Sequence, residues 1–218
     1  MVSYKVTRAT GTVELGSWDK GQWQSAKPLD IALFMGAKPE HIPRTQAKVL
    51  YDDQAVYVAF RVEDNYVRAI ASHQGSVCRD SCVEFFFIPS QQKDKGYFNL
   101  EMNCGGTMLF HFQLVPRQAA IPISDDLCKK IEVYHQLPEK IDPEIAQPTT
   151  WIVAYKLPVS ILKEYAPVAD PAPGVKWLAN FYKCADATSH PHWLTWAKVN
   201  KPKPDFHVPE SYAELVFD

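Results

Sequence analysis

A chain of 218 residues with a formal net charge of -2 and no cluster of lysine or arginine lacks the basic surface that nucleic acids and anionic membranes require. Hydrophobic residues make up 46% of it and charged residues 22%, which excludes a disordered chain and predicts one domain over residues 1–218. The five cysteines are odd in number and form no Cys-x-x-Cys pair, so we expect free thiols rather than a disulfide framework or a zinc ribbon.

The N-terminus, MVSYKVTRATG, contains no apolar segment that could act as a signal peptide. No later run approaches the roughly 18 apolar residues that a membrane span needs. As written, the sequence predicts a soluble, cytoplasmic protein, and a secreted protein whose leader had been removed would look the same. The sequence does not fix an oligomeric state.

The first third of the chain predicts edge strands, loops and one clear hairpin. Short β-like pieces occur at residues 4–6 and 12–13, and Pro39 and Pro43 prevent regular structure before residue 45. Residues 47–51 and 56–62 alternate in hydrophobicity around the turn Asp52-Asp53-Gln54, which predicts a β-hairpin. Two adjacent aspartates could suggest a metal site, but aspartate is common in turns because it bonds to its own backbone.

The next stretch predicts two adjacent core strands. Residues 82–88, CVEFFFI, are apolar on both faces, as in a central strand, and Glu84 is the one charged residue among them. Residues 97–103 alternate, so that Asn99, Glu101 and Asn103 share the face opposite the apolar side chains. A three-residue loop at 104–106, with a glycine at positive φ, pairs the large apolar residues of this strand with those of residues 108–112. His111 then joins the polar face.

The remainder predicts scattered short strands and one helix. Within residues 116–150 only 130–134 resembles a strand, and further strands are predicted at 151–157, 175–185 and 212–217. Residues 158–165 predict a short helix with Pro158 in its first turn. Seventeen prolines and many short strands without a βαβ rhythm predict an all-β fold, an antiparallel β-sandwich of the immunoglobulin or jelly-roll kind with one short helix.

The order of several motifs resembles the family-9 carbohydrate-binding modules and their DOMON-like β-sandwich relatives. The resemblance rests on Trp23 with Ala26, on TQAKVLYDD from residue 45, on DSCVEFF from residue 80, on YFNLEMN from residue 97 and on FHVPESY from residue 206. It covers nearly the whole chain and implies a β-sandwich that binds a carbohydrate without catalysis. The expected partner is therefore a small-molecule or oligosaccharide ligand.

The resemblance also implies where a sugar would bind. In sugar-binding members two tryptophans clamp a ring while polar groups of the strands between them bond its hydroxyls. Glu84 matches a strand glutamate of that site, Cys78 stands at one clamp position and Phe206 at the other. Glu101 falls where such members have an arginine. Either the ligand differs, or other residues such as Trp193 or His73 rebuild the clamp.

We therefore expect a ligand-binding groove beside an aromatic C-terminal loop, with no catalytic residues and no metal. Its predicted residues are Glu84, Asn99, Glu101, Phe206, His207, Trp193 and Cys78. A purely structural alternative for Glu84 is an ion pair with Arg61 or Arg79, since buried charges are usually paired. Trp196 is predicted to belong to the core, and Trp18 and Trp23 to the core or its rim.

Three alternatives remain open from the residues alone. Glu84 and Glu101, with Asp80 nearby, could form the carboxylate pair of a glycoside hydrolase. A structural or protein-interaction sandwich without a sugar ligand is the second alternative. For a metal, His190, His192 and His207 could supply three nitrogens. Calcium is conceivable in such a module, but the sequence has no acidic loop of the required density, so no cofactor is expected.

Overall fold

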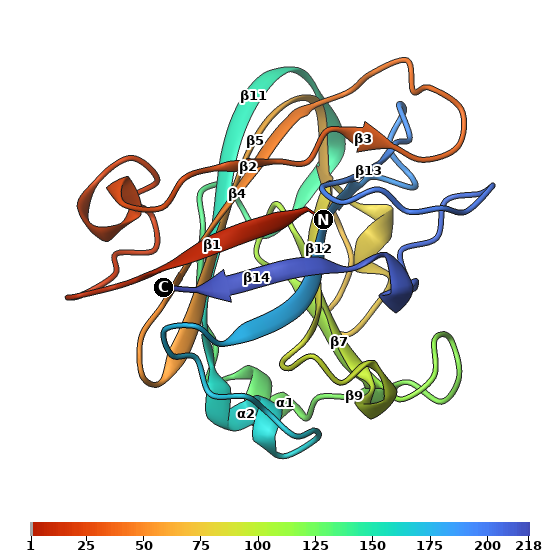
Figure 1. Cartoon of the computed structure of the whole chain (residues 1–218). Helices are drawn as coiled ribbons and strands as arrows, with labels where there is room; N and C mark the ends of the chain where they lie inside the picture. The colour runs from red at the N-terminus through yellow and green to blue at the C-terminus, as the bar shows by residue number, and fades with distance from the viewer. Residues whose placement is uncertain (1) are drawn as a thin grey trace.

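The structure is a computed structural model that describes residues 2–218, and it consists mainly of β-strands in two sheets packed face to face (Figure 1). The first sheet contains β3 (Leu33–Phe34), β6 (Cys82–Ile88), β7 (Tyr97–Asn103), β8 (Met108–Gln113), β9 (Ile121–Pro122), β12 (Lys176–Cys184), β13 (Trp193–Thr195) and β14 (Ala213–Phe217). The second contains β2 (Leu29–Asp30), β4 (Arg44–Tyr51), β5 (Ala55–Ala69), β10 (Glu132–His135) and β11 (Ile141–Pro158). The all-β sandwich predicted from the sequence is thus confirmed.

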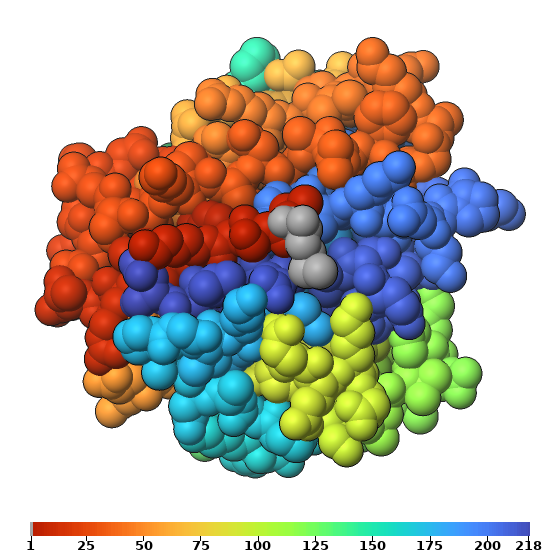
Figure 2. Space-filling view, viewed as in Figure 1, coloured from red at the N-terminus to blue at the C-terminus, as the bar shows by residue number. Residues whose placement is uncertain are grey.

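Strand β1 (Ser3–Arg8) joins the two sheets. Residues 3–6 pair in parallel with β14, and Thr7 and Arg8 pair in parallel with β4. Figures 1 and 2 show this strand in red against β14 in dark blue. Each part of β1 pairs with one strand only and lies at the edge of its sheet, as predicted, although the side chains of Tyr4 and Val6 are buried. Residues 12–13 form no strand.

Both predicted hairpins are confirmed, the second also in its predicted register. Between β4 and β5, Tyr51 pairs with Val56, and the Asp52 carboxylate accepts hydrogen bonds from the backbone N–H groups that follow it in the turn. Between β7 and β8, Met102 pairs with Met108, and Gly106 in the loop has a φ of 83°. The large apolar residues of β7 and β8 therefore share the inner face, and Asn99, Glu101 and His111 lie on the outer one.

The segment before residue 151 is more regular than predicted. Strand β11 is 18 residues long and contains Pro143 and Pro148, which led us to expect irregular structure. The pairing of β11 with β5 shifts register between Ile141 and Ile145 and again between Ala146 and Thr149. Each proline falls inside one of these irregularities, where a strand tolerates the loss of a backbone donor.

The described residues, 2–218, form two short helices instead of the one predicted. Helix α2 (Val159–Lys163) is the predicted one and begins after Pro158, whereas α1 (Asp125–Cys128) was not expected. Single 3-10 turns occur at Gly21–Gln24, Val77–Arg79, Lys93–Lys95 and Pro209–Ser211. Within residues 2–218 none of the helices has the length and hydrophobicity that a membrane crossing requires.

Apolar side chains are buried on the outer faces of the sheets as well as between them. The N-terminal segment covers the second sheet with Trp18 and Trp23, which confirms their assignment to the core or its rim, and Trp196 packs partly buried against the central core. The C-terminal loop covers the first sheet with Phe206 and other apolar side chains. This cover explains why both faces of β6 are apolar, and it encloses Glu84 beneath the loop.

Candidate functional site

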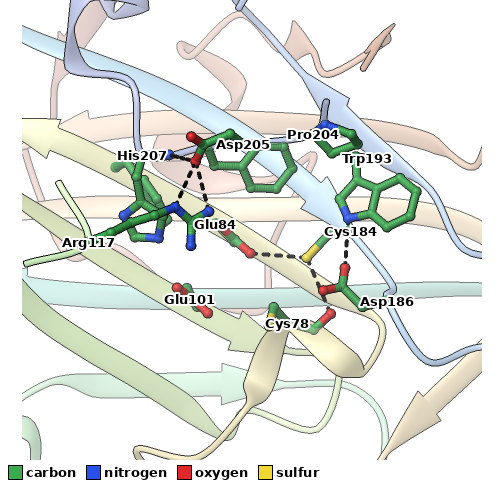
Figure 3. Close-up of a pocket in the computed structure, with 12 residues that line it drawn as sticks. Cys78, Glu84, Glu101, Arg117, Cys184, Asp186, Trp193, Pro204, Asp205 and His207 are labelled. Atoms are coloured by element: carbon green, nitrogen blue, oxygen red, sulfur yellow. Dashed lines mark hydrogen bonds and ion pairs between the residues drawn. The ribbon is translucent and has the colours of Figure 1, made fainter. Parts of the chain in front are cut away.

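A pocket of about 180 Å³ lies on the outer face of the first sheet, beneath the C-terminal loop (Figure 3). Strands β6, β7 and β12 form its floor, and loop residues form its walls. Its lining residues are Cys78, Glu84, Phe86, Glu101, Arg117, Cys184, Asp186, Trp193, Pro204, Asp205, Phe206 and His207. Six of the seven site residues predicted from the sequence therefore meet around one cavity, and Asn99 lies in an adjoining hollow.

Glu84 and Glu101 are the central pair of the floor. They are directly opposite each other on β6 and β7, and their side chains belong to residues that are only 2% and 6% exposed. Burial raises the pKa of Glu101 to about 7. Burial and the neighbouring Glu101 raise the pKa of Glu84 well above its usual value. Like charges directly opposite in a sheet repel each other. Near neutral pH this favours a protonated carboxyl within the pair of Glu84 and Glu101.

Glu84 has no cationic partner among the described residues. Its Oε1 accepts a hydrogen bond from the Cys184 thiol at 3.0 Å, whereas its buried Oε2 has no hydrogen-bond partner. The expected ion pair with Arg61 or Arg79 is absent from residues 2–218, and Arg61 instead contacts Glu63 at 2.8 Å. The reason is topological, because Arg61 belongs to the second sheet and Glu84 faces outward from the first.

Asn99 connects the floor to a second hollow of about 490 Å³, which shares Cys78, Glu101, Arg117 and His207 with the pocket. The Asn99 amide donates to Glu101 Oε1 at 3.1 Å and its carbonyl accepts from Gln113 at 2.9 Å. His111 also lines this hollow. The polar face predicted for β7 and β8 is therefore a surface that borders a cavity.

His207 is held in one orientation above the floor. Its Nδ1 lies 2.7 Å from the Tyr97 hydroxyl and 3.3 Å from Gln113 Nε2. Burial and the nearby Arg117 guanidinium lower the pKa of His207 to about 4. The imidazole is therefore neutral at pH 7 and can donate or accept one hydrogen bond at its free nitrogen.

Arg117 and Asp205 form a wall that the sequence did not reveal. The Arg117 guanidinium donates to Asp205 Oδ1 from Nε at 3.2 Å and from Nη2 at 2.8 Å. The Arg117 backbone has a φ of 59°, and its N–H donates to the Gln113 side chain at 2.9 Å. A left-handed conformation is unusual for arginine and costs free energy, which the surrounding contacts must supply. Figure 3 shows Arg117 and Trp193 on opposite sides of the view, with Glu84 between them and Glu101 below Arg117.

The aromatic groups of the pocket differ in how free they are. The half-buried Trp193 donates its indole N–H to Asp186 at 2.8 Å, so the ring is fixed at the rim. Phe206 stacks on Tyr182 with ring centroids 4.1 Å apart, so one of its faces is occupied. Cys78 lines the pocket from its 3-10 turn, and burial raises the pKa of its thiol.

Two other predicted groups lie elsewhere. His73 is 3.4 Å from Asp125 and lines a separate hollow, so it does not rebuild an aromatic clamp. Asp80 accepts hydrogen bonds from the backbone N–H groups of Ile70 and Ala71 and from the Asn103 amide. Asp80 therefore stabilises the backbone at the start of β6 and lies outside the pocket.

The three C-terminal histidines do not converge on one point. His190 stacks on Tyr66, and His192 contacts the buried Lys183 at 2.8 Å, while His207 belongs to the pocket. A three-histidine metal site is therefore not formed. The one group among the described residues with three potential metal ligands within 4.8 Å of one another is Cys82, Glu84 and Cys184. Sulfur suits soft cations, whereas calcium takes six to eight oxygens, so this group does not match calcium.

The fold and the site together define a β-sandwich ligand-binding domain with a polar pocket on the outer face of one sheet. The chain belongs to carbohydrate-binding family 9, because the model of that family matches residues 23–217.

Three solved structures resemble the chain over almost its whole length. A candidate carbohydrate-binding protein from Bacteroides uniformis ATCC 8492 shares 24% identity, with 99% of each chain covered and a TM-score of 0.88. A family-9 module from Caldicellulosiruptor kristjanssonii in complex with cellotriose shares 13% identity, with 99% and 93% of the two chains covered and a TM-score of 0.66. Its complex with glucose gives 11% identity, coverage of 98% and 95%, and a TM-score of 0.66. No curated protein matched the chain.

Proposed function

We propose that this pocket binds one ring of a carbohydrate and that the adjoining hollow accepts the next part of an oligosaccharide. A cavity of about 180 Å³ is smaller than the pockets of about 300–1,000 Å³ that hold drug-sized ligands, which suits a single ring. The shared lining residues allow a longer ligand to continue into the second hollow. The family assignment and the sugar complexes of similar structures support this function.

The observation that carries the proposal is the unpartnered Oε2 of Glu84. A buried polar atom without a hydrogen bond costs free energy, and such atoms in native proteins call for an explanation. A sugar hydroxyl can both donate and accept, so it satisfies this oxygen whether or not the carboxyl is protonated. Glu101 and His207 offer further polar atoms around the same cavity, and Trp193 offers an apolar ring face.

The geometry favours binding over hydrolysis. Glycoside hydrolases place two carboxyl groups on opposite sides of the bond that is cleaved. Here Glu84 and Glu101 project from neighbouring strands on one floor, and Asp80 is engaged elsewhere. Release of reducing sugar from an oligosaccharide by the wild-type protein, abolished in Glu101→Gln, would contradict a purely binding role.

Calorimetric titration with D-glucose and cellotriose tests the proposal. In Glu84→Met the side chain keeps its length but loses both oxygens, and we expect affinity to fall at least tenfold because a buried sugar hydroxyl loses its partner. Glu132→Met, which changes an exposed glutamate of the second sheet, should leave affinity unchanged. The proposal is refuted if the folded wild-type protein binds neither sugar, or if Glu84→Met binds as well as the wild type.

A further inference from the structure

The pocket contains more carboxyl groups than cations. Glu84, Glu101, Asp186 and Asp205 all line it, and Arg117 is its one arginine or lysine. Both hydrogen bonds of the Arg117 guanidinium go to Asp205. Its hydrogen bonds are therefore used within the wall, and its charge acts on Glu101 of the floor only from a distance.

The other three carboxyl groups have neutral partners only. Glu84 accepts from the Cys184 thiol, Glu101 from the Asn99 amide and Asp186 from the Trp193 indole. Across residues 2–218 none of these three carboxylates lies within salt-bridge distance of a lysine, an arginine or a histidine. Glu84 and Glu101 are buried, whereas Asp186 is exposed, and buried carboxyl groups are normally paired with a cation.

The two buried glutamates converge at the base of the cavity. Glu84 and Glu101 are cross-strand neighbours, and Glu84 Oε2 is buried without any hydrogen-bond partner. Asp186 adds negative charge at the rim. A ligand ammonium group at the base would face two carboxyl groups in surroundings of low dielectric, where attraction between opposite charges is several times stronger than in water. It would also donate a hydrogen bond to the free Glu84 Oε2. A neutral sugar hydroxyl can donate such a bond too, but the bond from an ammonium group is stronger because its donor is charged.

We propose that the pocket selects sugars that carry a protonated amine, such as 2-amino-2-deoxy sugars, over neutral sugars of the same ring. This inference rests on the proposed function, since the amine is recognised as a substituent of a ring that the pocket already accepts. The ammonium group lies between Glu84 and Glu101, and the ring lies beside Trp193. An ammonium group between the two carboxyl groups favours their ionised form, so that in the complex the charges of ligand and floor compensate each other.

Matched sugars test this selectivity by calorimetric titration at pH 7. D-Glucosamine should bind at least tenfold more tightly than D-glucose and N-acetyl-D-glucosamine, which keep the ring but lack the charge. In Glu101→Gln, which retains shape and hydrogen-bonding capacity, the ratio of glucosamine to glucose affinity should fall below threefold. Thermal denaturation establishes that the variant is folded, and Glu132→Gln should retain the wild-type ratio.

Each other outcome overturns a defined part of the account. Glucose binding that equals or exceeds glucosamine binding refutes the amine preference and leaves sugar binding intact. Failure of all three sugars to bind refutes the proposed function as well. Ethanolamine serves as an amine without a ring, and if it binds as tightly as glucosamine, the pocket recognises amines rather than amino sugars. An unchanged ratio in a folded Glu101→Gln variant shows that this carboxyl does not recognise the amine.

Discussion

Substitution of Glu101 by glutamine should change how the stability of the protein depends on pH. Burial raises the pKa of Glu101 to about 7, above the usual 4.5 that the unfolded chain retains. The folded state therefore holds the Glu101 proton in a range where the unfolded chain has released it, and ionisation of this carboxyl destabilises the fold. Its contribution to stability is fully present below pH 4.5 and is lost as the pH rises through 7.

The magnitude follows from the size of the shift. One pKa unit corresponds to about 1.4 kcal/mol, and part of the loss has already occurred at pH 5, so the remaining loss between pH 5 and pH 8 is about 2 kcal/mol. Glutamine does not ionise and keeps the shape of the side chain. The unfolding free energy of Glu101→Gln should therefore rise relative to that of the wild type by this amount over the same range.

Urea unfolding at pH 5, 6, 7 and 8 measures this difference. The charged and titratable groups that line the pocket with Glu101 are Glu84, Cys78, Cys184, Asp186, Arg117, Asp205 and His207. The groups without direct contact with Glu101 are present in both proteins, so most of their effect cancels in the comparison. Glu84 is the exception, because the neighbouring Glu101 raises its pKa and Glu101→Gln removes that contribution. The unfolding free energy of Glu132→Gln should change with pH in the same way as that of the wild type. A difference for Glu101→Gln that stays constant or shrinks as the pH rises would refute the electrostatic account of the floor.

Three further predictions concern neighbouring residues. Trp193→Ala should weaken sugar binding, measured by calorimetry, about tenfold or more, because an anchoring ring at the rim is lost. The stability of the protein should change little. Unchanged affinity would exclude the ring from the site. Cys184→Ala should cost about 1–3 kcal/mol in urea unfolding, more than Cys184→Ser, because it removes the donor to Glu84; equal costs would contradict that role. Lys183→Met should lower the free energy of unfolding by about 3–5 kcal/mol in the same assay, because Asp64 loses its buried cation at 3.6 Å. An unchanged free energy of unfolding would show that His41 alone is a sufficient partner for Asp64.

Local patterns predicted the strands and registers well because each depends on a few neighbouring residues. The pairing of Met102 with Met108 followed from the requirement that apolar side chains share one face. The sequence did not predict that strand β1 joins the two sheets, since its parallel partners are distant in sequence and leave no local signal. The first half of β11 was missed because Pro143 and Pro148 weaken the strand pattern, although irregular pairing accommodates them.

The candidate site was predicted in part for a similar reason. Alternation along β7 placed Glu101 and Asn99 on one face, and the resemblance directed attention to Glu84. Arg117 and Asp205 could not be found in this way, because they lie in loops 88 positions apart and meet only in the folded chain. The signal that was available for Arg117 was the pair of polar residues His111 and Gln113 on the outer face of β8, shortly before its loop.

A crystal structure of the protein at saturating D-glucose tests the central claim most directly. We predict one sugar ring in the pocket beneath the C-terminal loop, with a hydroxyl within about 2.6–3.2 Å of Glu84 Oε2 and the ring beside Trp193. Sugar bound on another face of the sandwich, or a pocket that holds only water while Glu84 Oε2 contacts the protein's own side chains, would contradict the account.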